Sequence, residues 1–330
     1  MSVPRLDPGT RRRSARARRL RRRRAAAGLG LVAVLAIAIA VLAGGGGGGK
    51  SGGGSSAGST QRGDARARAR VRVQVVRVAQ TGTLPAPVQD AAAAAVGPER
   101  FLLMGGLDQA EGSVADIVSA SPTGASRAGT LPSALHDASA STLGGTAYLF
   151  GGGVVASFPQ ITRVTPSGST QSAGQLPTPA SDVATVAVGS TVYVIGGYTG
   201  QVPLRTILAW RPGAGARVVG TLPKPLRYAA VASIGGQIVI AGGTSGEAAS
   251  RDIYRFDPAT GTLSRFGLLP SPLTHAAAAS VGGAVLVFGG RDASPTSQTR
   301  RILAIAPDGS VRAAGLLPRP LSDLAAVALG

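Results

Sequence analysis

Residues 176–197 read LPTPASDVATVAVGSTVYVIGG, which is a Leu-Pro pair, two short apolar runs and a closing glycine pair. The same order returns roughly every 46 residues, and a period in this range is the signature of a repeat architecture. The Leu-Pro pairs begin at Leu84, Leu131, Leu176, Leu222, Leu269 and Leu317, and the glycine pairs begin at Gly105, Gly151, Gly196, Gly242 and Gly289. The period and the order of these motifs therefore predict a repeat fold without reference to any single residue.

Each full unit also carries a turn in which a proline is followed by a glycine within three residues. The prolines are Pro122, Pro166, Pro212, Pro258 and Pro307. Proline fixes φ and glycine supplies positive φ, so these segments of two to four residues favour tight turns. The segments between the turns are short and rich in Val, Ile, Ala and Leu, and beyond residue 60 no long helical periodicity appears. Each unit is therefore expected to form four short strands.

Four-stranded units repeated around an axis make a β-propeller. The order and spacing of the glycine and proline motifs in these units resemble those of the Kelch family over roughly residues 80–330. In that family the glycine pair ends the second strand, and a later strand carries Tyr-Asp-Pro followed by a Trp. Residues 256–263 keep this spacing, with Phe256 and Leu263 in place of the aromatic pair, and Trp210 stands at the Tyr position of the preceding unit. The resemblance implies an all-β, Kelch-like propeller similar to the central domain of galactose oxidase.

The number of blades follows from the two ends of the repeat region. Five complete units run from Leu84 to Leu316, and residues 317–329 then supply one further first strand. The run Val71–Val78 precedes the first Leu-Pro pair and can supply neighbours to that strand. We expect a propeller over residues 66–330 with six blades, the last closed by both termini; five blades are the alternative.

The N-terminal quarter has a different composition. Residues 1–24 hold eleven arginines and one acid, and Ala25–Ala43 follow as nineteen residues without a charge. As a helix this segment would be about 28 Å long, close to the thickness of a bilayer core. The apolar run therefore predicts a transmembrane helix or signal anchor over residues 25–43. The arginines predict that residues 1–24 form a cytoplasmic tail. A flexible Gly/Ser-rich linker over residues 44–65 would then hold the propeller outside the cytoplasm; a secreted protein released by signal cleavage is the alternative.

The formal net charge of +19 comes mostly from the tail and the stalk. Residues 79–330 carry 16 basic and 13 acidic groups, so the propeller itself is nearly balanced. The basic excess is explained by membrane topology and by attraction to anionic lipid headgroups. We therefore expect no nucleic-acid partner.

One set of polar residues recurs at an equivalent position, six residues after the Leu of each Leu-Pro pair. The set is Asp90, Asp137, Asp182, Tyr228, His275 and Asp323. Each residue should lie at the start of an innermost strand, so the six would form a ring at one mouth of the central channel. Such a ring could bind a cation or a polyhydroxy ligand; alternatively it is structural, with short polar side chains that accept backbone N–H groups.

Cysteine is absent and only two histidines are present, which excludes thiol nucleophiles and thiolate zinc sites. The Kelch-like copper oxidase of galactose needs a Tyr–Cys crosslink and two histidine ligands, so its activity cannot be carried over. We assign no catalytic residue, no metal site and no cofactor from the sequence.

The most irregular connections follow the glycine pairs and should cluster on one face. They are Leu107–Ala115, Val154–Gln160, Tyr198–Arg205, Thr244–Arg251 and Arg291–Arg301. Sites on propellers are usually built from such loops. The favoured function is a membrane-anchored, extracytoplasmic and non-catalytic binding or scaffold module for a protein, a peptide or a surface glycan. Because some six-bladed Kelch-like propellers isomerise sialic acid, the resemblance implies an alternative, a sugar-modifying enzyme of the isomerase or epimerase kind with acid–base groups at the channel mouth.

Overall fold

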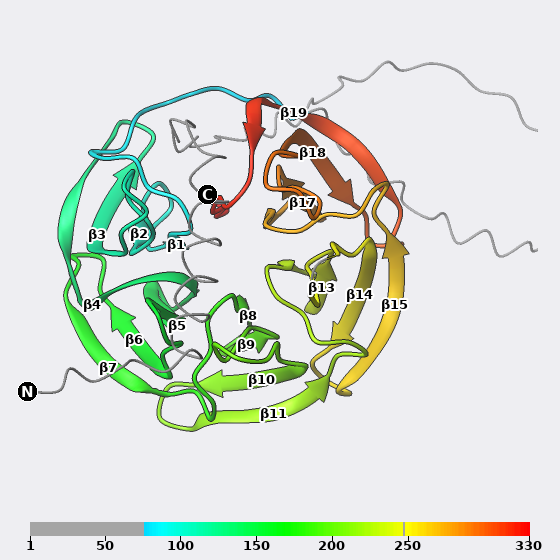
Figure 1. Cartoon of the computed structure of the whole chain (residues 1–330), viewed down its shortest axis with the longest axis horizontal. Coiled ribbons are helices and arrows are strands. Elements are labelled where there is room, and N and C mark those ends of the chain that lie inside the picture. The colour runs from blue at the N-terminus through cyan, green and yellow to red at the C-terminus, as the bar shows by residue number, and fades with distance from the viewer. Residues whose placement is uncertain (1–75, 247) are drawn as a thin grey trace, which may run out of the picture.

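The computed structural model describes residues 76–246 and 248–330, and within these residues the chain is all-β. Its strands form four antiparallel sheets arranged around a central axis (Figure 1). This arrangement confirms the expected propeller. The expected tail, membrane segment and linker of residues 1–24, 25–43 and 44–65 lie outside the described residues, and within the described part no helix is long and apolar enough to cross a membrane.

The first sheet contains seven strands and makes two blades that share one long strand, β4. Its strands are β1 (Ala92–Ala95), β2 (Phe101–Met104), β3 (Val114–Ser121), β4 (Gly124–Leu143), β5 (Thr146–Gly153), β6 (Gln160–Val164) and β7 (Thr170–Gln175). The first half of β4 pairs with β3 as an outer strand, and its second half pairs with β5 as an inner strand.

Each of the other three sheets is a separate four-stranded blade. The third blade has β8 (Ala184–Val188), β9 (Thr191–Ile195), β10 (Thr206–Arg211) and β11 (Gly215–Thr221). The fourth has β12 (Ala230–Ile234), β13 (Gln237–Ala241), β14 (Asp252–Asp257) and β15 (Thr262–Leu268). The fifth has β16 (Ala277–Val281), β17 (Ala284–Phe288), β18 (Thr299–Ile305) and β19 (Val311–Leu321).

The hydrophobic core lies between neighbouring blades, because their sheets pack face to face. All five residues of β9 are buried, as are all five of β17, so these second strands are buried on both faces without alternation. Tyr193 and Ile195 of the third blade pack with Ile238 and Ile240 of the fourth. The leucines of the Leu-Pro pairs that follow the five blades fill the same seams and are at most 4% exposed: Leu131, Leu176, Leu222, Leu269 and Leu317.

The glycine pairs are the joints between blades. Gly196 has φ 61°, and a Cβ there would lie 2.1 Å from the carbonyl oxygen of Leu226 in the next repeat. The next amide, of Gly197, donates a hydrogen bond of 2.8 Å to the same oxygen. All five pairs repeat this contact, and the other acceptors are Leu135, Ala180, Leu273 and Leu321. The glycines are therefore required by close backbone contact as well as by positive φ.

The C-terminal segment, residues 322–330, lies between the fifth and first blades and contains no strand (Figure 1). Its side chains alternate between two cores. Leu324 and Ala326 pack against the core of the fifth blade, while Ala325 and Val327 pack against the first. At the outer rim, the amide of Val76 donates a 2.8 Å hydrogen bond to the carbonyl of Ala314 on β19.

The channel mouth as candidate functional site

The six repeat-equivalent residues are joined by a closed ring of backbone hydrogen bonds. The N–H of each one donates to the carbonyl of the ring residue before it, and the N–H of Asp90 donates to Asp323, over N–O distances of 2.8–3.3 Å. All six have φ between 52° and 59°. The ring thus runs through Asp90, Asp137, Asp182, Tyr228, His275 and Asp323.

This left-handed conformation explains the residue types at the ring. Outside glycine it is adopted mostly by Asn, Asp and His, whose short side chains tolerate it, and five of the six positions hold Asp or His. Turning φ positive points each N–H along the ring towards its neighbour. The N–H groups of the ring are therefore satisfied by backbone carbonyls and not by capping side chains. The repeated position provides the backbone conformation that this requires.

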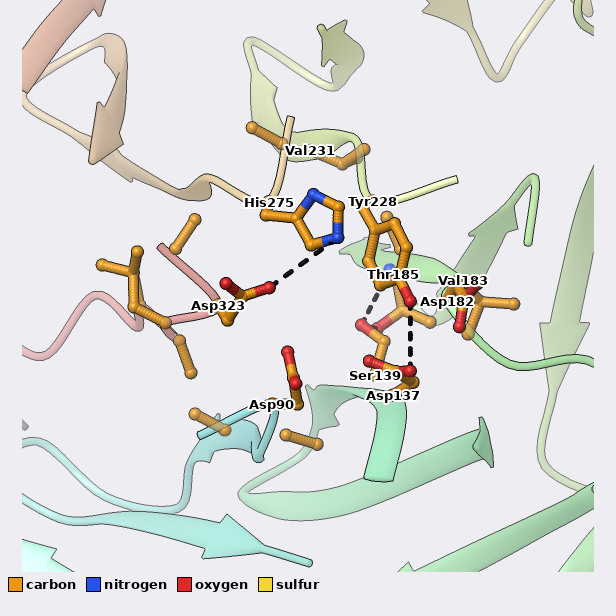
Figure 2. Close-up of a pocket in the computed structure, with 18 of the residues that line it drawn as sticks. Asp90, Asp137, Ser139, Asp182, Val183, Thr185, Tyr228, Val231, His275 and Asp323 are labelled. Carbon is orange, nitrogen blue, oxygen red and sulfur yellow. Dashed lines mark hydrogen bonds and ion pairs between the residues drawn. The ribbon is translucent and has the colours of Figure 1, made fainter. Parts of the chain in front are cut away.

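The ring surrounds one end of a cavity of about 170 Å³ in the central channel (Figure 2). Below the ring, the cavity is lined by the inner strands, which carry mostly alanine there. Two polar residues interrupt this lining, since Ser139 and Thr185 join neighbouring blades through a hydroxyl–hydroxyl contact of 2.9 Å. The structure therefore brings all six predicted residues together at the mouth; whether they bind a ligand stays a prediction.

One side of the mouth is built around Arg227. Its guanidinium forms an ion pair with Asp182, whose side chain is 2% exposed. The same group lies over the ring of Tyr198, 4.1 Å from its centroid, and 5.1 Å from the centroid of Tyr228. A buried carboxylate is costly unless it is paired, so Arg227 is what allows Asp182 to be enclosed here.

Tyr228 connects this side to the rest of the ring. Its hydroxyl donates to Asp137 over 3.1 Å, and its ring stacks on that of His275 with centroids 3.8 Å apart (Figure 2). Burial raises the pKa of Tyr228 well above its ordinary value, and the Asp137 and Asp182 carboxylates raise it further. The hydroxyl consequently keeps its proton and remains a hydrogen-bond donor.

Asp323 lies beside one arginine and one imidazole ring. His275 Nε2 lies 3.7 Å from one carboxylate oxygen and Arg291 Nε lies 3.8 Å from the other. Arg291 also contacts His275 Nε2 at 3.0 Å. The charge of Asp323 is thus balanced from the fifth blade.

Asp90 and Asp137 complete the acidic side of the mouth. Burial raises the pKa of Asp90 well above its ordinary value, and the nearby carboxyls of Asp137 and Asp323 raise it further. Burial also raises the pKa of Asp137, as does Asp182, while the hydrogen bond from Tyr228 opposes the shift. Among the described residues no group of three or more Asp, Glu, His or Cys side chains has a geometry that could hold a metal ion.

Three residues at the mouth were not predicted from the sequence: Arg227, Arg291 and Tyr198. Arg227 directly precedes a ring residue, while Tyr198 and Arg291 directly follow glycine pairs. Short β-bridges join these two positions in the third, fourth and fifth repeats. An alignment of the repeats, which predicts the six ring positions, also places these three residues at equivalent positions beside the ring.

Several charged side chains of the loops that follow the glycine pairs are structural. Arg205, Arg251 and Arg300 each donate from Nε to the carbonyl of the leucine in the following Leu-Pro pair, at 2.9–3.0 Å. In the first blade, Asp108 accepts hydrogen bonds from two amides of its own loop. These side chains hold the loops to the blades.

Two neighbouring loops instead expose apolar side chains on the face that carries the mouth. Val155 is 92% exposed, Val202 is 57% exposed and Val154 is 49% exposed. The loops touch, because the hydroxyl of Ser157 donates to the carbonyl of Tyr198 over 2.8 Å. We call Val154, Val155 and Val202 the loop patch.

Comparison with known proteins agrees with this architecture. The Kelch motif matches residues 179–218 and 225–262, which cover most of the third and fourth blades. The solved structure of YjhT is similar with a TM-score of 0.64 at 14% sequence identity, covering 72% of this chain and 87% of that one. At this identity the likeness concerns the fold, and no curated protein matches the sequence.

Repeated four-stranded blades, glycine-pair joints and a polar mouth define a β-propeller. The two motif matches and the similar fold support a Kelch-repeat β-propeller, as the glycine and proline pattern predicted.

Proposed function

We propose that this chain is a non-catalytic binding module, a membrane-anchored and extracytoplasmic propeller that presents its loop face to a partner protein or peptide. The observation that carries the proposal is the loop patch. Three exposed valines lie on two touching loops of the face that carries the mouth, and exposed apolar side chains grouped on loops commonly mark contact sites. The ring carboxylates Asp182 and Asp323, in contrast, are already paired within the protein.

A site-specific crosslinking experiment tests this proposal. A photoreactive amino acid is placed at Val155 in the full chain, and in a matched variant at Val218, which is 56% exposed on the outer strand β11. We expect a discrete crosslinked species from Val155 that is lost when Val202→Glu is added, and none from Val218. Equal crosslinking from both positions, or no effect of the added glutamate, would contradict the proposal.

The location is the second part of the proposal, and it rests on the sequence. A span at residues 25–43 with the arginine-rich tail of residues 1–24 inside would leave the propeller outside, on the flexible linker of residues 44–65. Protease added to intact cells should then remove the propeller. Recovery of the domain in the medium would instead favour signal cleavage, and protection from protease would contradict both.

We also propose that the propeller has six blades, with the sixth closed by both termini. Two contacts support this. Asp323 closes the backbone ring between His275 and Asp90, as a residue of a sixth repeat would. A Cβ on Gly315 would lie 3.0 Å from the carbonyl of Val76, much as one on Gly267 would contact Gly309 of the next blade. Cysteines introduced into residues 66–75 and β19 should crosslink if this blade forms.

A second candidate function, a sugar isomerase or epimerase activity, is favoured by one feature of the mouth. Asp90 and Asp137 have raised pKa values beside a cavity, as catalytic acids and bases often do. Exchange between sugar epimers or anomers, followed by NMR, tests it. Activity that is lost in Asp137→Asn without loss of stability would support the enzyme over the binding module.

A further inference from the structure

Residues 324–330 lie in the place of an inner strand in the sixth repeat (Figure 1). They follow the ring residue Asp323 as β12 follows Tyr228, and Gly330 lies seven residues after Asp323, as Gly235 lies after Tyr228. Their side chains alternate between the cores of the fifth and first blades, as those of β12 alternate between the cores on its two faces. The segment thus has the length and the orientation of an inner strand.

Within the described chain this segment has no second strand to pair with. In each of the five blades the inner strand pairs through one edge with the second strand, as β12 pairs with β13 and β16 with β17. No backbone hydrogen bond joins residues 324–330 to another described residue. An unpaired edge of this kind is a template for a further strand.

The joint that follows a second strand is also unused at this repeat, among the residues that the structure describes. In five repeats the second glycine of the pair donates its N–H to the carbonyl that lies four residues after the leucine of the next Leu-Pro pair. At the sixth repeat the equivalent carbonyl is that of Val88, four residues after Leu84, and no described amide donates to it. The edge and this carbonyl are the two backbone contacts that a second strand and its glycine pair make in the other blades.

We propose that the seam between the fifth and first blades binds an extended apolar segment of a partner protein, which adds to residues 324–330 as the second strand of the sixth blade. This contact site is separate from the loop patch. The inference rests on the proposed membrane span and on the proposed closure by six blades.

The complete blades define the chemistry of the partner segment. The five residues of β9 and of β17 are all buried, so the added strand must be apolar on both faces. A Cβ at the first glycine of each pair would overlap the carbonyl that the second glycine binds, so two glycines must follow the strand. A run of about five aliphatic or aromatic residues followed by Gly-Gly meets both requirements, and addition of such a strand to an open edge is a general mode of peptide recognition.

The residues of this chain that precede the described part do not offer such a strand. The proposed span assigns residues 25–43 to the membrane, and residues 44–65 contain no Val, Ile, Leu, Met or aromatic residue. Residues 66–75 carry an arginine at every second position from Arg66 to Arg72, and a strand buried on both faces cannot accommodate unpaired charges. We therefore assign the strand to another protein.

Hydrogen exchange of the full chain in detergent, measured by mass spectrometry with a synthetic peptide, tests the inference. The probe is Gln-Ile-Val-Ile-Ala-Gly-Gly, the sequence of residues 237–243, which form β13 and its glycine pair. Protection of residues 324–330 should rise with peptide concentration, by about tenfold at ten times the Kd of the peptide, because the bound strand engages the amides of this edge. Protection of β16, which already pairs with β17, should stay unchanged.

A matched peptide tests the glycine joint. In Gln-Ile-Val-Ile-Ala-Ala-Ala the strand is kept and the glycine pair is replaced, so overlap at the carbonyl of Val88 should weaken binding by about tenfold or more. Equal binding of the two peptides, or protection of residues 324–330 that does not respond to the first, would overturn the inference. Neither result would bear on the loop patch, which crosslinking at Val155 tests.

Two other results would assign the edge to a different strand. Protection that is present without peptide and is lost in Val41→Asp would show that residues 39–45, an apolar run followed by glycines, fill the edge. That outcome would refute both the partner strand and the proposed span. Protection that rises with protein concentration in the absence of peptide would assign the edge to a second copy of this chain and would equally refute a partner strand.

Discussion

Replacing Gly196 with alanine should destabilise the propeller far more than the same change at Gly189. Both glycines have positive φ, 61° and 58°, so an alanine at either site has a conformational cost of about 1–2 kcal/mol. At Gly189 nothing lies within 4 Å of the added Cβ, whereas at Gly196 the carbonyl oxygen of Leu226 lies 2.1 Å away. Gly189→Ala is therefore a matched control.

The difference between the two variants can be estimated from the joint. Relieving the clash needs a backbone shift in a packed seam, which costs about 1–3 kcal/mol. The shift also weakens the hydrogen bond from Gly197 to Leu226, a net loss of about 0.5–1.5 kcal/mol. We expect Gly196→Ala to lose roughly 2–4 kcal/mol more than Gly189→Ala, since the effect of alanine on the unfolded chain is the same in both.

Urea denaturation of the full chain measures this difference directly. Trp210 is the only tryptophan and is 1% exposed, so its fluorescence reports unfolding of the third blade and its seam with the second. Equal losses in the two variants would mean that the glycine pair is needed only for its backbone angle. The explanation of the pair as a joint between blades would then be wrong.

Three further changes have expected outcomes. Trp210→Ala should cost about 3–5 kcal/mol, because its ring is buried against two aromatic rings of the second blade; circular dichroism during urea unfolding measures it. Arg227→Met should cost about 3–5 kcal/mol by leaving Asp182 buried and unpaired, and adding Asp182→Asn should recover much of the loss in thermal denaturation. The folded-state pKa of Asp137 is raised, mainly by burial. Its contribution to the free energy of unfolding is therefore present below its unfolded-state pKa and is lost as the pH rises through its folded-state pKa. The stability of Asp137→Asn relative to the native chain should therefore increase from pH 4 to pH 8 in urea titrations.

The architecture could be predicted because each repeat contains the residues that its turns and its contacts with the next blade require. The glycine pair must be glycine where backbone meets backbone, and a proline followed closely by a glycine favours a turn, so five copies of one pattern predicted five blades. The predicted turns at Pro212 and Pro258, for example, lie between β10 and β11 and between β14 and β15.

The ring positions could likewise be found from the repeat, but their physical reason could not. Nothing within one repeat reveals that the N–H of Asp137 donates to the carbonyl of Asp90, because that bond joins two blades. For the same reason the ion pair of Arg227 with Asp182 was not foreseen: the partners are 45 residues apart and meet only when neighbouring blades pack.

Backbone atoms close the ring, whereas side chains determine the chemistry at the mouth of the channel. Closure of the propeller and the chemistry of its mouth can therefore vary independently. Asp, Asn, His and Gly all tolerate the left-handed backbone conformation that the ring needs, so exchanging them at these positions changes the side chain at the channel mouth and keeps the ring. Related chains could therefore diverge at the mouth one repeat at a time while the fold stays constant. The same property makes these six positions a natural set for a combinatorial library, in which new binding chemistry is installed on an unaltered frame.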